Sequence, residues 1–123
     1  MALKPGHYRL LVWQEAMRLV RQVYLVTDGM PGKERYGLQS QIRRAVTSIP
    51  SNIAEGAARG SKAEYMRFLQ IARGSLMELD TQLLLGQDLG YLGYDDGLRS
   101  AMESVLVKLN GLISSKQTGG KRA

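Results

Sequence analysis

The chain has 123 residues, a formal net charge of +6, a single histidine and no cysteine. This length predicts one domain, and the lack of cysteine excludes disulfides and thiolate-bound metals. Because His7 is the only histidine, sites that need two imidazoles for metal binding or acid–base catalysis are excluded as well. The longest apolar run covers residues 10–13, far short of the roughly 20 residues of a membrane-spanning helix. We therefore expect a cytoplasmic protein without a membrane segment, a metal site or a cofactor.

The first predicted element is a helix over residues 11–27. Apolar side chains recur at helical spacing from Trp13 onward, and Val12, Leu19 and Val26 form a second apolar line beside them. Together the two lines cover nearly half of the helix circumference, wider than the usual stripe of about 100°. Two interpretations remain open. Either the helix lies deep between its neighbours, or Val12, Leu19 and Val26 contact another subunit.

A glycine-rich loop over residues 28–35 separates this helix from a second one, predicted over residues 36–59. Pro50 lies inside the second helix, where it removes one backbone hydrogen bond and clashes with the carbonyl group four residues earlier. The apolar spacing keeps its register across Pro50, so the pattern predicts one kinked helix. Its predicted core residues are Leu38, Ile42, Ala45, Val46, Ile49 and Ile53.

Two further helices are predicted over residues 62–89 and 96–114. Gly60 suits the left-handed position that follows a helix. Ser61 and Glu64 form the S-x-x-E pattern of a capping box. The chain between Gly60 and Ser61 is therefore the predicted junction of the second and third helices.

The last helix is expected to begin at Asp95 or Asp96, because a carboxylate there caps free backbone N–H groups. Residues 114–123 lose the apolar periodicity, so we expect them to form a disordered basic tail. The four helices predict an all-α fold: an antiparallel, up-and-down four-helix bundle with a proline-kinked second helix. Residues 1–113 form its single domain.

A polar line runs along the second predicted helix beside its apolar stripe. Its members are three or four residues apart and so share one face: Gln41, Arg44, Ser48, Asn52, Glu55 and Arg59. One interpretation is a solvent-exposed face. The other is a hydrogen-bonded polar seam, within the bundle or between subunits, with the candidate residues Gln41, Ser48, Asn52 and Glu55.

Positive charge is concentrated on the same helix. Residues 35–60 carry four arginines against one acid. Arginine forms bidentate contacts with phosphate, and a net positive protein attracts polyanions without sequence specificity. The pattern favours a surface that binds RNA or DNA, with the candidate residues Arg35, Arg43, Arg44, Arg59 and Lys62. No pair of residues suited to acid–base catalysis occurs with it, and no catalytic residue is predicted.

Residues 35–56, which include the run SIPSNIAEG, and residues 59–62 closely resemble the bacterial four-helix bundle protein family. Its members are encoded in intervening sequences of 23S rRNA genes, and accessory proteins of diversity-generating retroelements are distantly similar. The resemblance covers residues 8–94. It implies an all-helical bundle, a homopentamer arranged as a ring with a central channel, and no catalytic residues. The retroelement branch further implies nucleic-acid binding through a basic surface.

The sequence thus predicts a non-enzymatic, homo-oligomeric protein that binds RNA or DNA through a basic surface. Five chains of +6 each would carry about +30, a strong attraction for polyanions. The alternative is a structural or adaptor oligomer that binds a protein partner, in which the charge only maintains solubility.

Overall fold

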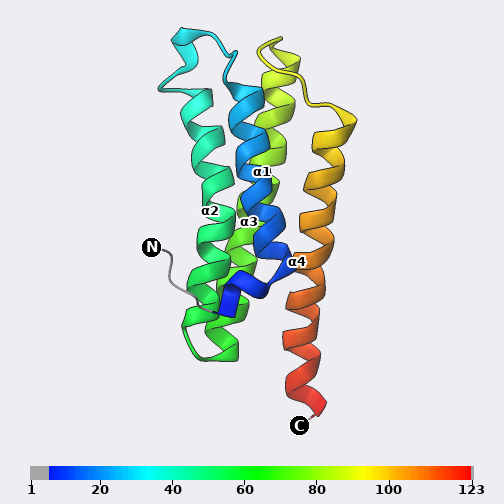
Figure 1. The fold of residues 1–123 in the computed structure, drawn as a ribbon. Helices are drawn as coiled ribbons and strands as arrows, with labels where there is room; N and C mark the ends of the chain where they lie inside the picture. The colour runs from blue at the N-terminus through cyan, green and yellow to red at the C-terminus, as the bar shows by residue number, and fades with distance from the viewer. Residues whose placement is uncertain (1–5, 123) are drawn as a thin grey trace.

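The computed structural model describes residues 6–122, with side chains described as far as Lys116. Its four helices are α1 Leu11–Thr27, α2 Leu38–Ala58, α3 Lys62–Asp88 and α4 Asp96–Arg122, and short 3-10 turns, η1 Gly6–Arg9 and η2 Gly32–Glu34, precede α1 and α2. The described residues contain no strand, so the predicted all-α four-helix fold is confirmed. In Figure 1 each helix runs opposite to the one before it. No described helix is long and apolar enough to cross a membrane.

α2 begins at Leu38 rather than at Tyr36, because residues 35–37 form a hydrogen-bonded turn. The Glu34 carboxylate accepts the N–H of Leu38 at 3.1 Å, and the Glu34 carbonyl accepts the N–H of Gly37 at 3.0 Å. Glu34 thereby satisfies one of the free N–H groups at the start of α2. Tyr36 consequently belongs to the turn that precedes the helix and not to the helix itself.

The predicted junction before α3 is confirmed. Gly60 has a φ of +80°, in the left-handed region, and the Ser61 hydroxyl accepts the N–H of Glu64 at 3.1 Å. The Glu64 side chain does not complete a capping box but accepts a hydrogen bond from Nε of Arg67 at 2.9 Å. This hydrogen bond lowers the pKa of Glu64.

α2 and α3 make the most extensive contact of any two elements. Small residues allow their backbones to approach: a Cβ atom added to Gly56 of α2 would lie 2.7 Å from Cβ of Phe68 on α3. Further along the same contact, the Ser48 and Ser75 hydroxyl oxygens lie 2.8 Å apart. No larger side chain fits between the helices at Gly56, so this position fixes how closely they pack.

α2 continues without a break through the buried Pro50, as predicted. Side chains around it donate to carbonyl groups four residues earlier, from Thr47 to Arg43 at 2.9 Å and from Ser51 to Thr47 at 2.8 Å. Back-bonding of this kind competes with the helix ladder and favours bending. The kink at Pro50 itself stays a prediction.

The core contains buried residues of all four helices, including Ile42 of the predicted core, Leu69 and Leu109. Val12 and Leu19 belong to it as well, with exposed fractions of 2% and 0%, and Val26 packs against it partly buried. The line of Val12 and Leu19 therefore packs within its own chain, whereas Met17 on the other apolar line is 45% exposed. This burial contradicts a subunit contact of Val12 and Leu19, and a subunit contact of Val26, which is partly buried, stays a prediction.

α1 contacts α4 through a small polar group. The Ser104 hydroxyl donates to the Glu15 carboxylate at 2.6 Å, and the Lys108 ammonium lies 2.9 Å from both the Glu15 carboxylate and the Ser104 hydroxyl. Burial raises the pKa of Glu15, but the hydrogen bonds from Ser104 and Lys108 and the positive charges outweigh it and lower the pKa overall. Glu15 is therefore held ionised between the two helices.

α4 begins after Asp95, whose carboxylate accepts the N–H of Leu98 at 2.8 Å, so Asp95 rather than Asp96 is the cap. The helix ends later than predicted, since the backbone remains helical as far as Arg122. The Lys116 ammonium lies 4.8 Å from the centre of the Tyr65 ring, which ties this part of α4 to α3. The helix therefore continues beyond the residue at which the apolar periodicity is lost. Residue 123, the last of the predicted disordered tail, lies outside the described residues.

The α2–α3 contact predicts the effect of a single methyl group. Gly56→Ala is expected to lower the free energy of unfolding by about 1–3 kcal/mol, because Phe68 has to move. Gly111→Ala is the matched control: nothing lies within 4 Å of its added Cβ on α4, and removing a helical glycine raises stability by about 1 kcal/mol. Urea unfolding of both variants checks this, and a stabilising Gly56→Ala would contradict it.

Candidate functional site

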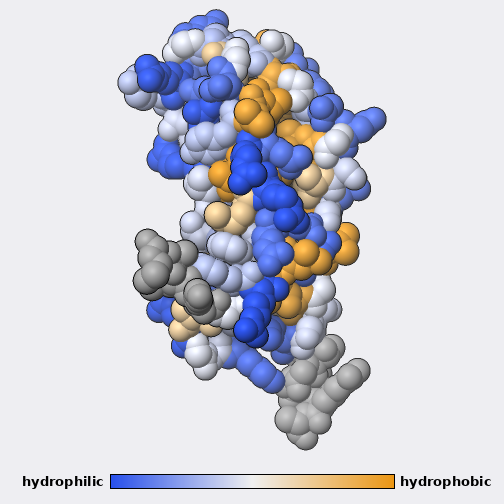
Figure 2. Space-filling view, viewed as in Figure 1, coloured by the Kyte–Doolittle hydropathy of each residue, from blue (hydrophilic) through white to orange (hydrophobic). Residues whose placement is uncertain are grey.

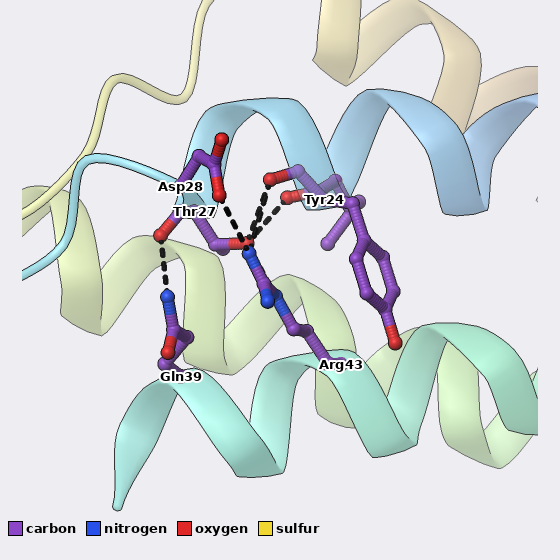
Figure 3. A network of polar contacts seen from close by, with 6 residues as sticks. Tyr24, Thr27, Asp28, Gln39 and Arg43 are labelled. Atoms are coloured by element: carbon purple, nitrogen blue, oxygen red, sulfur yellow. Dashed lines mark hydrogen bonds and ion pairs between the residues drawn. The ribbon is translucent and has the colours of Figure 1, made fainter. Parts of the chain in front are cut away.

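Arg43 lies against the carboxyl end of α1 (Figure 3). Its Nε donates to the Thr27 hydroxyl oxygen at 3.1 Å, and its Nη2 donates to the Tyr24 carbonyl oxygen at 3.3 Å. The same nitrogen makes a longer contact of 3.5 Å with the Asp28 carboxylate. The guanidinium also lies 4.4 Å from the centre of the Tyr24 ring. Three quarters of the Arg43 side chain is thereby covered.

These contacts supply hydrogen-bond partners to the carboxyl end of α1. The last carbonyl groups of a helix lack partners within it and carry partial negative charge. Arg43 places a cation there, and Gln39 donates to the Thr27 carbonyl oxygen at 2.9 Å (Figure 3). The Thr27 hydroxyl, fully buried, donates to the Val23 carbonyl oxygen at 2.7 Å while it accepts from Arg43. Arg43 thus joins α1 to α2, and its predicted contact with nucleic acid stays a prediction.

An open groove of about 370 Å³ lies beside Arg43, where the end of α1 meets the start of α2. We call it the arginine groove and define it by its lining residues, Tyr24, Arg35, Tyr36, Gln39, Ser40, Arg43, Arg44 and Thr47. Within the described part of the chain, none of these side chains is acidic. Arg35 and Arg44 are exposed, and no described acidic side chain forms an ion pair with either. Both guanidinium groups are therefore available to an anionic ligand.

The other two predicted cations, Arg59 and Lys62, lie at the opposite end of α2. At a rise of 1.5 Å per residue, Arg44 and Arg59 are about 22 Å apart along the helix axis. Arg59 forms an ion pair with Glu55 at 2.8 Å. The five predicted residues therefore form two separate groups instead of one basic surface, and only the arginine groove holds several together.

The polar line of α2 also divides. Ser48 faces α3, where its hydroxyl contacts that of Ser75. Nδ2 of Asn52 donates to the Ser48 carbonyl oxygen at 2.8 Å and to the Ser48 hydroxyl at 2.9 Å. Gln41 and Glu55 are exposed. Each interpretation of the line therefore describes part of it, with a polar seam within the bundle at Ser48 and Asn52 and a solvent-exposed face at Gln41 and Glu55.

Two tyrosines of the arginine groove, Tyr24 and Tyr36, were not among the predicted site residues. Tyr24 continues the helical spacing of apolar residues that begins at Trp13, which favoured a place in the core, yet its side chain is 39% exposed. Tyr36 is 89% exposed, and the Arg35 guanidinium lies 5.9 Å from the centre of its ring. The only signal for Tyr36 was its place beside Arg35 next to a glycine-rich loop, where helical periodicity carries no information.

Two other hollows are less cationic. The groove between α1 and α4, about 490 Å³, has Glu15 in its lining beside Arg18. The cavity between α3 and α4, about 260 Å³, contains Asp80, which accepts a hydrogen bond from the Tyr94 hydroxyl at 2.7 Å. Burial, together with Asp80, raises the pKa of Tyr94. Among the residues that the structure describes, no group of three or more His, Cys, Asp or Glu side chains is placed to hold a metal ion.

The fold defines the class: a small protein whose described residues form four packed helices. Within this class, the chain belongs to the family of 23S rRNA-intervening sequence proteins, whose model matches residues 8–111. The resemblance drawn from residues 35–62 is thereby confirmed. No curated protein matches the chain.

The contacts of Arg43 predict a mainly structural effect of its removal. Arg43→Met keeps most of the aliphatic stem but loses the hydrogen bonds to α1, so the free energy of unfolding should fall by about 1.5–3 kcal/mol. Arg44→Met, the matched control on the next residue, is expected to change it by less than about 0.5 kcal/mol because Arg44 is exposed. Equal effects in urea unfolding would contradict this assignment.

Proposed function

We propose that this protein is a non-enzymatic, cytoplasmic homo-oligomer that binds RNA or DNA through the arginine groove. The observation that carries the proposal is the composition of the groove, which brings three arginines together without an acidic side chain in its described lining. The net charge of +6 adds a longer-range attraction for polyanions.

The chemistry of the lining suits phosphate. A guanidinium group presents a planar set of donors that matches two phosphate oxygens, and it stays charged at every physiological pH. Arg35 and Arg44 supply two such groups, while the Ser40 hydroxyl lies beside them as a neutral donor of the kind that contacts nucleic-acid backbones. Arg43 adds charge to the wall, although its own donors are used at the end of α1.

Exposed apolar side chains support self-association. Four of them lie on α3 and a fifth directly follows it, each at least 39% exposed: Ile71, Met77, Leu84, Leu85 and, after the helix, Leu89. Others, such as Leu25 on α1 and Val107 on α4, are exposed as well. Figure 2 shows hydrophobic residues between hydrophilic ones on the face that it draws. Burying these side chains against other chains would remove apolar surface from water, which favours association.

The homopentamer stays a proposal from the family resemblance, with the apolar side chains of α3 replacing Val12 and Leu19 as candidate contacts. The same side chains also fit the alternative function, an adaptor oligomer with a protein partner. Light scattering separates a single chain of 13.6 kDa from an oligomer, and a monomer at all concentrations would contradict this part of the proposal.

Charge reversal in the groove tests nucleic-acid binding. Arg44→Glu should weaken the binding of labelled RNA at low salt by at least roughly tenfold, because it removes one phosphate contact and adds repulsion. Wild-type affinity should also fall steeply as salt rises. Fluorescence anisotropy measures both.

Arg18→Glu is the matched control for this experiment. It makes the same change in net charge on α1, in the groove that faces α4, and leaves the arginine groove intact. An equal loss in both variants would show that overall charge, and not the groove, attracts RNA. No binding by the wild-type protein at low salt would contradict the proposal altogether.

A further inference from the structure

Tyr36 is the most exposed large side chain of the described apolar and aromatic residues, at 89%. A tyrosine ring that stays in water buries little apolar surface and so adds little to the stability of the fold. It presents a flat aromatic face at low cost in conformational entropy, since only two side-chain torsions need to be fixed on binding. Its position at the rim of the arginine groove therefore calls for a ligand-based explanation.

The turn that carries Tyr36 is held in place by hydrogen bonds on both sides. The N–H of Arg35 donates to the Gly32 carbonyl oxygen at 3.1 Å, and the N–H of Gly37 donates to that of Glu34 at 3.0 Å. The Glu34 carboxylate then fixes the start of α2 through Leu38. A Cβ atom at Gly37 would lie 2.9 Å from that carboxylate, so glycine leaves room for the Glu34 side chain at the start of α2. The ring is thus presented from a defined backbone.

Arginines of the groove both precede and follow Tyr36 in the sequence. Arg35 lies beside it, at 5.9 Å from the guanidinium carbon to the ring centre, and Arg44 lines the same groove from α2. Tyr24 forms part of the wall, where its ring is already in contact with Arg43. Among the aromatic side chains of the groove, Tyr36 therefore has the most ring surface open to a ligand.

We infer that the arginine groove takes an unpaired nucleotide, with its base stacked on Tyr36 and the neighbouring phosphates bound by Arg35 and Arg44. This inference rests on the proposed function and narrows its ligand to single-stranded or looped-out nucleic acid. Bases within a duplex are covered on both faces by their neighbours and cannot stack on a side chain. An open groove of about 370 Å³ also falls within the usual size of sites for small molecules, about 300–1,000 Å³.

Base stacking and phosphate contacts make separable contributions to the binding affinity. Base–aromatic stacking tolerates any base, because every base has a π face, and it adds selectivity for single strands. The arginine contacts act on single and double strands alike. Changing Tyr36 should consequently alter the preference between the two kinds of strand, whereas changing Arg44 should weaken both.

Anisotropy with two labelled probes of equal length, a single-stranded RNA without self-pairing and the same RNA in a duplex, tests the inference. Tyr36→Ala should weaken single-strand binding by roughly 5- to 100-fold and leave duplex binding unchanged. Tyr36→Leu should behave like Tyr36→Ala, since it is apolar but has no π face, and Tyr36→Phe should restore wild-type affinity. Single-stranded DNA of the same sequence should lose affinity by the same factor on Tyr36→Ala.

Because Tyr36 is almost fully exposed, these variants should keep the urea midpoint and the oligomer mass of the wild-type protein. The inference fails, while the proposed function stands, if Arg44→Glu weakens both probes and Tyr36→Ala changes neither. It fails as well if Tyr36→Ala lowers the oligomer mass, which would make Tyr36 a contact between protein chains. If the wild-type protein binds neither probe at low salt, the proposed function and this inference fall together.

Discussion

The close contact of α2 with α3 is the constraint on which the rest of the structure depends. Gly56 leaves room for Phe68, and the Ser48 and Ser75 hydroxyls meet where larger side chains would separate the helices. Protein interiors are close-packed, so a forced shift of either helix would be transmitted to its neighbours. α1 is then joined to this pair through Arg43, and α4 through the apolar core that it shares with α3.

This contact gives a physical meaning to the run SIPSNIAEG. Ser48 and Asn52 form the polar seam that meets α3 at Ser75, Ile49 and Ile53 fill the core, and Gly56 admits Phe68. Most of the run therefore serves packing. The groove with free cations lies elsewhere, where a turn and the first part of α2 meet the end of α1. The resemblance therefore covers two roles: the run SIPSNIAEG packs α2 against α3, and residues 35–44, which belong to the same resemblance, line most of the groove.

The helices were predictable because each buries a stripe at a constant spacing, and Ser61 was predictable because its cap depends on local chain chemistry. The position of α1 was not, since periodicity gives the width of an apolar face but not whether its own chain covers it; Val12 and Leu19 show this. The role of Arg43 depends on Thr27, far away in sequence, and that of Tyr36 on the turn before α2. Both roles depend on tertiary contacts, which the spacing of residues along the sequence does not reveal.

Native-state hydrogen exchange tests most directly whether the α2–α3 pair holds the fold together. Amides that open only with global unfolding exchange most slowly, and less stable elements open at lower free energy. The account predicts that the slowest amides lie on the facing sides of α2 and α3, around Ile49 and Ala72, and that those of α4 exchange faster. Slower exchange in α1 or α4 than in α2 and α3 would contradict it.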